Sequence, residues 1–597
     1  MKLKFREVFI FCLFVLFIAL IVIHLFLHSI CDWKGYRVEV EKTQERVFEE
    51  LPVKGNFYDR NNRPLTQDKD VCWVFFDKKA KVFTKFDVPK NQCPLTPTLA
   101  INLLAKTLGK NPDELNEIIS NTPIEDYYID KNGKKVKRKR QYVCVAKNLD
   151  IKYLKLVNKL NYKGIFAEKR TMRYYPEGSL ASRVLGITKV DGAPHEGLEL
   201  KYASYTQGAP GKYVAQVDKI GRPILNTKVY LTDEKTGKKL KKEDGNNITL
   251  TIDTNIQYYA EKALNDMAAV QKPAHAMCIV MDPYTSEILA MANYPKLDPN
   301  NIKEYTPGMS QNFCVENMYE PGSTLKAFTV AMAVNEGYGA DYAFGTCTNV
   351  ISFGHGIKVK CDHGPHGACS PRNIIAKSCN IGAWYCTKKI GKETLYKYLN
   401  EFGVLGRPGE EFKTEAVGYI KNKPEKWVPV DACNYSFGQG MLTSCLAMAN
   451  GYCVLANGGV YHTPKIIKEI KDLNGKVILE EKQDEGKRVI SEATSKTMAE
   501  LLAGCVNNGT GKPAKLPNCQ AAGKTGSAQI FEKGKGYKSG KYLASFIGFA
   551  PAEKPELVVA VMVEYPKASS YGSVVAAPVW EKTMEKSLNY KKVGMRN

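Results

Sequence analysis

Residues 320–337 of this chain read EPGSTLKAFTVAMAVNEG, and the fold is built around them. Pro321 and Gly322 stand where a helix would begin and Gly337 where it would end, so we expect one helix here. This helix carries too many apolar residues to lie alone in solvent, so we expect it inside a domain. The apolar residues are Phe328, Val330, Met332 and Val334.

Ser323 and Lys326 are three residues apart, so a helix places both side chains on one face. Ser323 lies near the start of that helix, where free backbone N–H groups and the helix dipole favour an oxyanion. Among all serines of the chain, Ser323 alone is followed by a lysine three residues later. The pair therefore predicts a serine nucleophile with a lysine as its general base.

Lys326 can accept a proton only when its amine is neutral. Lowering the pKa of a lysine from about 10.4 to about 7 costs roughly 4.6 kcal/mol, which burial and a second cation can supply together. Three Lys-[Thr/Ser]-Gly triplets offer that second cation. The triplets at 235–237 and 538–540 lie in polar turns, whereas Lys524 of Lys524-Thr525-Gly526 enters a predicted strand. We therefore expect Lys524 in the site.

Ser378-Cys379-Asn380 is the third element of the candidate site. It lies within a helical-looking stretch, PRNIIAKSCNIGAWYC at 371–386. A Ser-x-Asn triplet is a weak signal, because 310–312 and 587–589 match it as well. The copy at 378–380 is favoured by its place in the chain between Ser323 and Lys524.

The predicted strands lie at both ends of one domain. Apolar or alternating stretches occur at 275–281 and 287–293, and again at 519–529, 542–549 and 556–564, before a helical ending at 573–588. The middle is mainly helical. Strands from both ends that enclose a helical middle predict an α+β domain with helices packed on one sheet.

The net charge of +23 would suit nucleic acid, anionic lipid or an anionic substrate equally well, so charge alone does not choose a partner. Residues 8–23, VFIFCLFVLFIALIVI, form an apolar run of bilayer length once Leu25 to Leu27 are added. Lys2, Lys4 and Arg6 precede it. The positive-inside rule then keeps residues 1–7 in the cytoplasm and exports the rest, which removes nucleic acid as a partner.

A cleaved signal peptide and a lipoprotein signal are the alternatives for this segment. The run is followed by no A-x-A cleavage pattern, and bulky Ile30 directly before Cys31 fits lipoprotein processing poorly. We therefore expect a retained, single-pass signal anchor at 8–27.

The order Ser-x-x-Lys, Ser-x-Asn, Lys-Thr-Gly resembles the signature of penicillin-binding proteins and serine β-lactamases. The segments GNFYDRNNRPLT (55–66), RYYPEGSLASRVLG (173–186), EGLELKY (196–202), YEPGSTLK (319–326) and SFGQG (436–440) resemble the class B, monofunctional transpeptidases, nearest to the division type. The resemblance covers nearly the whole chain. It implies an elongated, mixed α/β pedestal (dimerisation) domain at 28–240 and a penicillin-binding transpeptidase domain at 241–597, with a central antiparallel sheet flanked by helices.

The resemblance also implies a reaction. Ser323 would attack a D-Ala carbonyl of a peptidoglycan stem peptide, Lys326 would take its proton, and Ser378 with Asn380 would relay protons and position the substrate. Lys524 and the substrate-binding residues Thr525, Gly526 and Ser527 would hold the terminal carboxylate, and the N–H groups of Ser323 and Ser527 would form the oxyanion hole. β-Lactams would acylate the same serine. No cofactor is expected.

The family implies a place and a partner as well. The chain would be anchored in the cytoplasmic (inner) membrane with its catalytic domain outside, and would work with a polytopic membrane glycosyltransferase, since it has no polymerising domain. A β-lactamase or a penicillin-sensing receptor is the nearest alternative, although neither needs a pedestal. A membrane-anchored, non-enzymatic scaffold for cell-wall assembly is the alternative from another class.

Seventeen cysteines occur without regular spacing, which is typical of small buried residues rather than of a disulfide framework. The loop 361–369, CDHGPHGAC, contains Cys361, His363, His366 and Cys369 and has the residue types of a zinc site, although the spacing is compressed. We expect plain loop structure first, a Cys347–Cys361 disulfide second and a metal site third.

Overall fold

The computed structural model describes residues 5–27, 45–86, 94–123, 125–129, 135–139, 141–190, 192–217, 223–302, 306–362, 364–409, 411–412, 414–530, 537 and 540–592. The chain forms two compact units. The smaller comprises residues 1–55, 204–246 and 472–475, and the larger comprises residues 56–203, 247–471 and 476–597.

The smaller unit begins with the apolar helix α1 (Phe5–Phe26). Its segment Val8–Phe26 has the length and composition to cross a membrane, as the apolar run at 8–27 predicts. Later in this unit, β1 (Glu45–Glu50) pairs antiparallel with β10 (Gly211–Gln216), which also pairs with β11 (Val229–Tyr230). Lys228 at the start of β11 binds Glu50 of β1 at 2.6 Å.

The larger unit contains a five-stranded antiparallel sheet in the order β14-β13-β27-β26-β25. Its strands come from both ends of the domain, as the sequence predicts. They are β13 (His275–Met281), β14 (Ile288–Tyr294), β25 (Ala522–Gln529), β26 (Tyr542–Ala550) and β27 (Leu557–Glu564).

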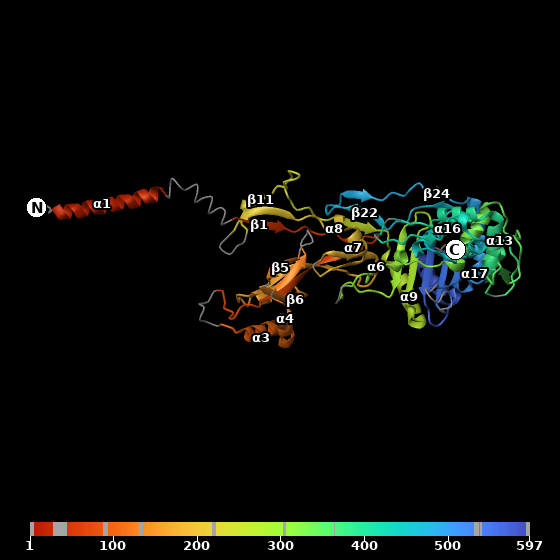
Figure 1. The fold of residues 1–597 in the computed structure, drawn as a ribbon, viewed down its shortest axis with the longest axis horizontal. Coiled ribbons are helices and arrows are strands. Elements are labelled where there is room, and N and C mark those ends of the chain that lie inside the picture. The colour runs from red at the N-terminus through yellow and green to blue at the C-terminus, as the bar shows by residue number, and fades with distance from the viewer. Residues whose placement is uncertain are drawn as a thin grey trace. The chain divides into compact units, whose positions relative to one another are not determined.

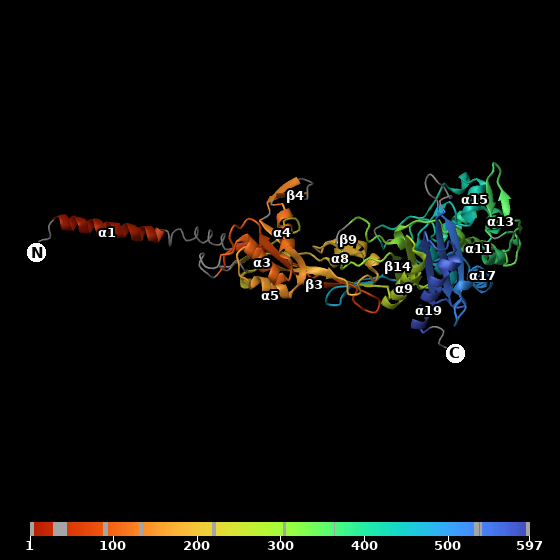
Figure 2. The same ribbon diagram turned by 90° about the horizontal axis from the view of Figure 1, so that it is seen from below.

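Helices cover both faces of this sheet (Figures 1 and 2). On one face, α9 (Thr254–Gln271) and α19 (Ala577–Tyr590) enclose an apolar core in which Trp580 packs edge-on against Phe546. The other face is covered by α16 (Cys445–Ala456), with α17 (Glu492–Asn508) against β25, and α11 (Lys326–Asn335) packs on α17. The helix that carries Lys326 is therefore central, as its apolar sequence predicts.

The described residues between 67 and 174 form a separate three-stranded sheet with its own helices and core. Strand β3 (Gln67–Asp77) pairs antiparallel with both β6 (Tyr142–Asp150) and β7 (Ile165–Tyr174). Helices α3 (Pro97–Leu108), α4 (Pro112–Asn121) and α5 (Lys152–Asn158) share their core. Gly109 ends α3 in the left-handed conformation and Asn111 caps α4, so these two helices are separate.

Arg173 connects three of the sequence segments that carry the family resemblance. Its guanidinium binds Glu199 at 2.6 Å, Asp68 at 3.2 Å and the side-chain oxygen of Asn56 at 2.9 Å. The Arg173 and Glu199 side chains are 1% and 0% exposed, so the pair is isolated from water. Segments 55–66, 173–186 and 196–202 thus meet at one buried ion pair.

A tight turn connects the first of these segments to the start of α9. Asp59 is fully buried and accepts hydrogen bonds from the backbone of Asn61 and Arg63 and from Thr254 at the start of α9. Asn62 has φ of 62°, and this left-handed residue completes a tight turn at 59–62.

The remaining elements are shorter. The helices among them are α6 (Ser182–Leu185), α7 (Gly197–Lys201), α8 (Ala203–Thr206), α10 (Phe313–Glu316), α14 (Lys392–Glu401), α15 (Pro429–Ser436) and α18 (Gly572–Val575). The strands are β2 (Phe57–Tyr58), β12 (Asn247–Leu250), β22 (Ile467–Lys471) and β23 (Val477–Glu480) in one sheet, and the pairs β4 (Glu125–Ile129) with β5 (Lys135–Lys139), β8 (Ile187–Thr188) with β9 (Pro194–Glu196), β19 (Tyr419–Ile420) with β20 (Met441–Leu442), and β21 (Val460–Tyr461) with β24 (Lys487–Arg488).

Replacing Arg173 with alanine leaves the buried Glu199 carboxylate beside an empty space instead of a cation. We expect Arg173→Ala to lower the free energy of unfolding by about 3 kcal/mol, the cost of breaking a buried pair from one side. Lys169→Ala on the same strand removes an exposed pair with Asp70 and should change it by less than about 1 kcal/mol. Urea unfolding of the detergent-solubilised chain measures both, and equal losses would contradict a special role for Arg173.

Candidate active site

Ser323 lies in a 3-10 turn, Gly322–Leu325, that leads directly into α11. The single helix predicted over 320–337 therefore begins as a tighter turn, which raises Ser323 above the buried helix. Lys326, the first residue of α11, is 0% exposed, whereas Ser323 is partly exposed. The Ser323 hydroxyl is accessible to a substrate, whereas the Lys326 amine below it is shielded from water.

The Lys326 amine contacts three of the predicted site residues. Its Nζ lies 2.8 Å from Ser323 Oγ, 2.7 Å from the Ser378 carbonyl oxygen and 2.6 Å from Asn380 Oδ1. Ser378 Oγ is 3.2 Å away. The Ser378 carbonyl and Asn380 Oδ1 are acceptors only, so they take the two protons of a neutral amine. The lone pair is left for the Ser323 hydroxyl proton.

Burial lowers the pKa of Lys326 to about 7, and the positive charge of Lys524 contributes to the same shift. The ring of Phe437, centred 5.9 Å from Nζ, forms part of the surroundings that exclude water. Burial also lowers the pKa of Lys524. Both lysines predicted for the site are therefore fully buried and close enough to affect one another electrostatically.

Ser378 and Cys379 separate two helices where the sequence predicts one. Helix α12 (Pro371–Lys377) ends at Ser378, whose backbone is left-handed with φ of 58°. Helix α13 (Asn380–Ile390) begins after Cys379, whose sulfur accepts a hydrogen bond from Gly382 N–H at 3.2 Å. The break turns both the carbonyl and the hydroxyl of Ser378 toward Lys326. In a continuous helix, that carbonyl would instead accept a hydrogen bond from a backbone N–H of the helix itself.

Lys524, Thr525, Gly526 and Ser527 lie on edge strand β25, which passes the nucleophile turn. Lys524 Nζ donates to the Thr525 carbonyl at 3.1 Å, and the Thr525 hydroxyl lies 2.8 Å from that of Thr510. Ser527 is exposed, and its Oγ accepts from Gly572 N–H at 3.0 Å. Of these four residues, Ser527 faces the open groove.

Three glycines let the backbone segments of the site approach closely. A Cβ on Gly322 would lie 2.9 Å from the Ala528 Cβ, and one on Gly526 would lie 2.3 Å from Ser545 Oγ. A Cβ on Gly438, within SFGQG, would lie 2.4 Å from the Gly322 carbonyl oxygen. Gly322 also donates its N–H to the Gly438 carbonyl at 3.0 Å. The nucleophile turn is thus clamped between β25 and the 436–440 loop.

A groove of about 540 Å³ runs over this clamp. Ser323, Asn380 and Ser527 line it together with residues that the sequence motifs did not indicate, among them Lys360, Gln529 and Tyr571. Lys360 contributes its carbonyl, which accepts from Asn380 Nδ2 at 2.9 Å. A backbone contact of this kind leaves no signal in the sequence. A larger cavity of about 910 Å³, near Tyr284 and Glu492, contains none of the predicted residues.

Of the two alternative Lys-[Thr/Ser]-Gly triplets, the one at 235–237 belongs to the smaller unit and forms a turn around the Asp233 side chain. Lys538 and Ser539 of the other lie outside the described residues.

Comparison with known families gives two matches. Residues 276–585 match the family model of the penicillin binding protein transpeptidase domain, and residues 49–242 match that of the penicillin-binding protein dimerisation domain. Among curated proteins, the stage V sporulation protein D of Bacillus subtilis is 30% identical over 545 residues, which cover 90% of this chain and 78% of that one. The probable peptidoglycan D,D-transpeptidase PenA of Neisseria meningitidis is 30% identical over 82% of each chain. The peptidoglycan D,D-transpeptidase FtsI of Escherichia coli is 26% identical over 90% of this chain and 83% of its own.

Solved structures share the fold. Penicillin binding protein 3 of Mycobacterium tuberculosis, complexed with aztreonam, matches with a TM-score of 0.66 and 23% identity, over 92% of this chain and 98% of that one. A peptidoglycan synthetase from Bifidobacterium adolescentis matches with the same TM-score and identity, over 92% and 97%. The α+β expectation, with an antiparallel sheet flanked by helices, is confirmed by the observed sheet and by these matches.

The pKa of Lys326 predicts the pH dependence of Ser323. Below pH 7 the amine is protonated and cannot act as a base, so the acylation rate should rise about ten-fold per pH unit and level off above pH 7. Lys524→Met removes the neighbouring cation, which raises the pKa of Lys326 and moves the midpoint to higher pH. The rate of labelling by fluorescent penicillin, measured from pH 5 to 9, reports this midpoint.

The exposed Lys515, changed to Met, serves as the control and should leave the midpoint in place. An identical midpoint in Lys524→Met and the wild type would rule out electrostatic coupling of the two lysines.

Gly322→Ala should remove most labelling of Ser323, because the added Cβ would collide with β25. Gly337→Ala is the matched control at the other end of α11: it too has a positive φ, 90°, but the added methyl meets open space. Labelling rates at equal protein concentration, with circular dichroism to verify folding, compare the two. Equal rates would show that the close approach is unimportant.

Proposed function

The chain belongs to the penicillin-binding transpeptidase family, and from this premise we propose that Ser323 and Lys326 form its acyl-transfer centre. The protein is a peptidoglycan D,D-transpeptidase, an enzyme that cross-links stem peptides through a serine acyl-enzyme and is acylated by β-lactams. The observation that carries the residue assignment is the Lys326 amine, which has two obligate acceptors and Ser323 Oγ at 2.8 Å. That arrangement leaves its lone pair directed at the hydroxyl.

The first half-reaction forms an ester. Ser323 Oγ attacks the carbonyl carbon of the penultimate D-Ala while Lys326 takes the hydroxyl proton. The N–H groups of Ser323 and Ser527 stabilise the resulting oxyanion. The C–N bond to the terminal D-Ala then breaks, and the leaving amine receives the proton held by Lys326, relayed through the Ser378 hydroxyl 3.2 Å away. Asn380 keeps Lys326 in position.

The second half-reaction makes the cross-link. The amine of a second stem peptide attacks the ester carbonyl, and a new amide bond forms as the C–O bond to Ser323 breaks. One proton of the attacking amine passes to Ser323 Oγ and restores the hydroxyl. A β-lactam follows only the first half. Its ring amide opens, but the leaving nitrogen stays attached to the acyl group, so the ester persists.

The terminal carboxylate of the donor peptide would be recognised at β25. Ser527 and Thr525 offer hydroxyl groups on the strand that passes the nucleophile turn, Gly526 allows the approach, and Lys524 beneath supplies a positive potential. A cation buried under the groove acts at longer range than an exposed one, because solvent screens it less.

The organisation of the chain supports a membrane-anchored enzyme. We assign residues 28–240 to the pedestal and residues 241–597 to the transpeptidase domain, with α1 as a single-pass anchor in the cytoplasmic membrane, residues 1–7 inside and the catalytic domain outside. The apolar length of α1 and the basic residues before it support this orientation. A C-terminal alkaline phosphatase fusion that stays inactive would contradict it.

We further propose that the enzyme serves division and takes its glycan strands from a polytopic membrane glycosyltransferase. The resemblance of segments 173–186 and 319–326 to the division branch supports the first. The match of residues 276–585 to a transpeptidase domain supports the second, because that reaction joins peptides carried by glycan strands. Affinity purification from membranes that recovers no such glycosyltransferase would count against the partnership.

Replacing Ser323 with alanine should abolish the stable adduct with fluorescent penicillin, because no other group supplies the attacking oxygen. Ser120→Ala, an exposed serine on α4, should label like the wild type. Gel fluorescence after denaturation measures the adduct.

Two other outcomes distinguish the alternatives. Rapid release of hydrolysed penicillin would indicate a β-lactamase, and a wild-type chain that forms no adduct would indicate a non-enzymatic scaffold.

A further inference from the structure

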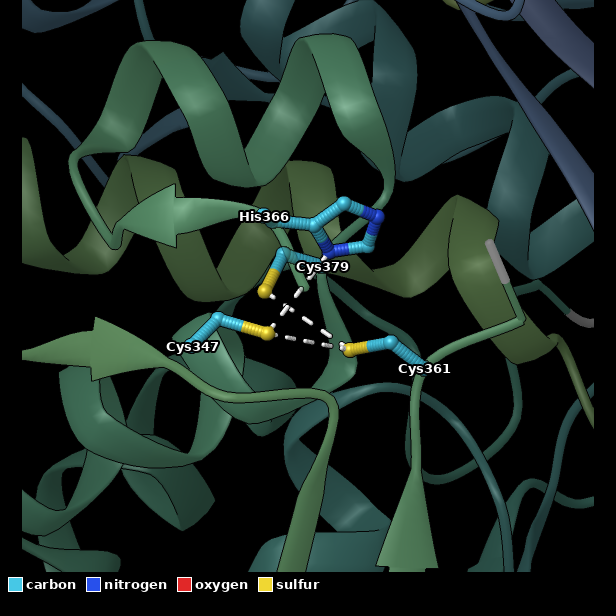
Figure 3. A group of neighbouring side chains, drawn as sticks. All are labelled: Cys347, Cys361, His366 and Cys379. Carbon is cyan, nitrogen blue, oxygen red and sulfur yellow. Dashed lines mark hydrogen bonds between the residues drawn. The ribbon is translucent and has the colours of Figure 1, made fainter. Parts of the chain in front are cut away.

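Four side chains, Cys347, Cys361, His366 and Cys379, converge on one point (Figure 3). Their ligand atoms all lie within 4.8 Å of one another. The three cysteines are buried and the histidine is half-buried. We propose that these four side chains, the Cys3His cluster, bind one zinc ion, and that this ion holds the Ser378–Asn380 turn against Lys326. The second half of the proposal rests on the proposed function.

The spacing of the ligand atoms fits a tetrahedral ion. Cys361 Sγ lies 3.7 Å from Cys347 Sγ and 3.8 Å from Cys379 Sγ, and Cys347 Sγ lies 3.8 Å from His366 Nδ1. In a tetrahedron with Zn–S bonds of about 2.3 Å, neighbouring sulfurs are about 3.8 Å apart. A disulfide would need about 2.05 Å. Three thiolates and one imidazole are also a common ligand set of structural zinc.

The β-ribbons that carry the ligands are too short to be stabilised by packing alone. Cys347 ends β15 (Thr346–Cys347), Cys361 follows β17 (Lys358–Lys360) and His366 precedes β18 (Gly367–Ala368). β15 pairs with β18, and β17 pairs with β16 (Val350–Ser352), in ribbons of two or three residues per strand. Two-stranded ribbons of this length are unstable alone.

The apolar cluster under these ribbons is equally small. Its buried members are Ile381 and four cysteines, which are the three of the Cys3His cluster and Cys369. A metal ion that joins four separate segments would supply the cross-links that such a core lacks, as in other small metal-stabilised folds.

Two of the four ligands adjoin the catalytic network directly. Cys379 is flanked by Ser378 and Asn380, both of which contact Lys326 Nζ. Cys361 follows Lys360, whose carbonyl accepts from Asn380 Nδ2 at 2.9 Å. An ion bound to both sulfurs fixes Asn380 from two sides. Gly382 N–H, 3.2 Å from Cys379 Sγ, would stabilise the bound thiolate from the second shell of the ion.

The sequence indicates this ligand set only in part. The window 361–369 contains Cys361 and His366, but the other two ligands, Cys347 and Cys379, lie outside it and approach only through the fold. His363 lies outside the described residues. Cys369 is buried in the same cluster and its thiol interacts with that of Cys379, but it lies outside the group of four whose ligand atoms are all within 4.8 Å of one another. Its replacement therefore tests whether these four are the ligands.

The test begins with the full chain in detergent, purified without a metal-binding tag. Elemental analysis should find about one zinc per chain. Replacement of zinc by Co²⁺ should give the strong visible absorption and sulfur-to-cobalt charge transfer of a tetrahedral site rich in thiolates. The cobalt spectrum needs no variant, so it remains decisive even if ligand variants fold poorly.

Variants then identify the ligands. Cys347→Ser and His366→Ala should each lose most of the bound zinc, whereas Cys369→Ser should retain it. Loss in Cys369→Ser with retention in His366→Ala would overturn the proposed ligand set. A zinc-free wild type would overturn the site altogether, whether peptide mapping then finds Cys347 and Cys361 joined in a disulfide or finds free thiols.

The positioning role has its own readout. Chelation of zinc from the wild type should slow acylation by fluorescent penicillin by about ten-fold or more, since misplacing a catalytic group by about 1 Å can cost on the order of 100-fold. Zinc should restore the rate and Mg²⁺ should not. An unchanged rate after verified zinc removal would refute the positioning role. If zinc-loaded wild type is not acylated at all, the proposed function fails, whereas the zinc count is unaffected.

Discussion

The amine of Lys326 has no exposed surface, and the arrangement of the catalytic part follows from keeping it so. A neutral lysine at physiological pH requires a dry environment, and a dry environment requires packed helices on every side. The hydroxyl of Tyr452 on α16 donates to the Thr324 carbonyl at 2.8 Å, and Thr329 on α11 donates to the Ser436 carbonyl at 2.7 Å. These buried bonds hold the nucleophile turn on the helices that exclude water.

Much of the fold could be predicted because its signals are local. The five strands of the main sheet are short apolar or alternating runs, and the burial of α11 follows from its own composition. The breaks were harder to predict. Ser378 ends a helix inside the stretch 371–386, because the left-handed turn is stabilised by contacts of its carbonyl and hydroxyl with Lys326. Tertiary contacts of this kind override helix propensity and leave no periodic signal.

The sequence could predict the part of the site that is formed by side chains. Ser323, Lys326, Ser378 and Asn380 do meet, and Lys524 is buried nearby, as their order in the chain indicates. The carbonyl of Lys360 contributes through the backbone, so any residue type could stand at that position. Cys379 occupies the variable position of Ser-x-Asn, and its approach to Cys361 depends on a turn that has no signal in the sequence.

The clamp made by Gly322, Gly438 and Gly526 forms the floor of the groove. Residues of this floor can be substituted much less freely than the residues at the rim of the groove. At these three positions a single methyl group would meet the backbone or a neighbouring side chain within 3 Å, so the floor tolerates almost no variation. Gln529 and Tyr571 line the groove with side chains that reach into solvent. Under selection by an inhibitor that mimics the substrate, adaptive change is therefore confined to the rim, and the floor preserves a shape that successive inhibitors can share.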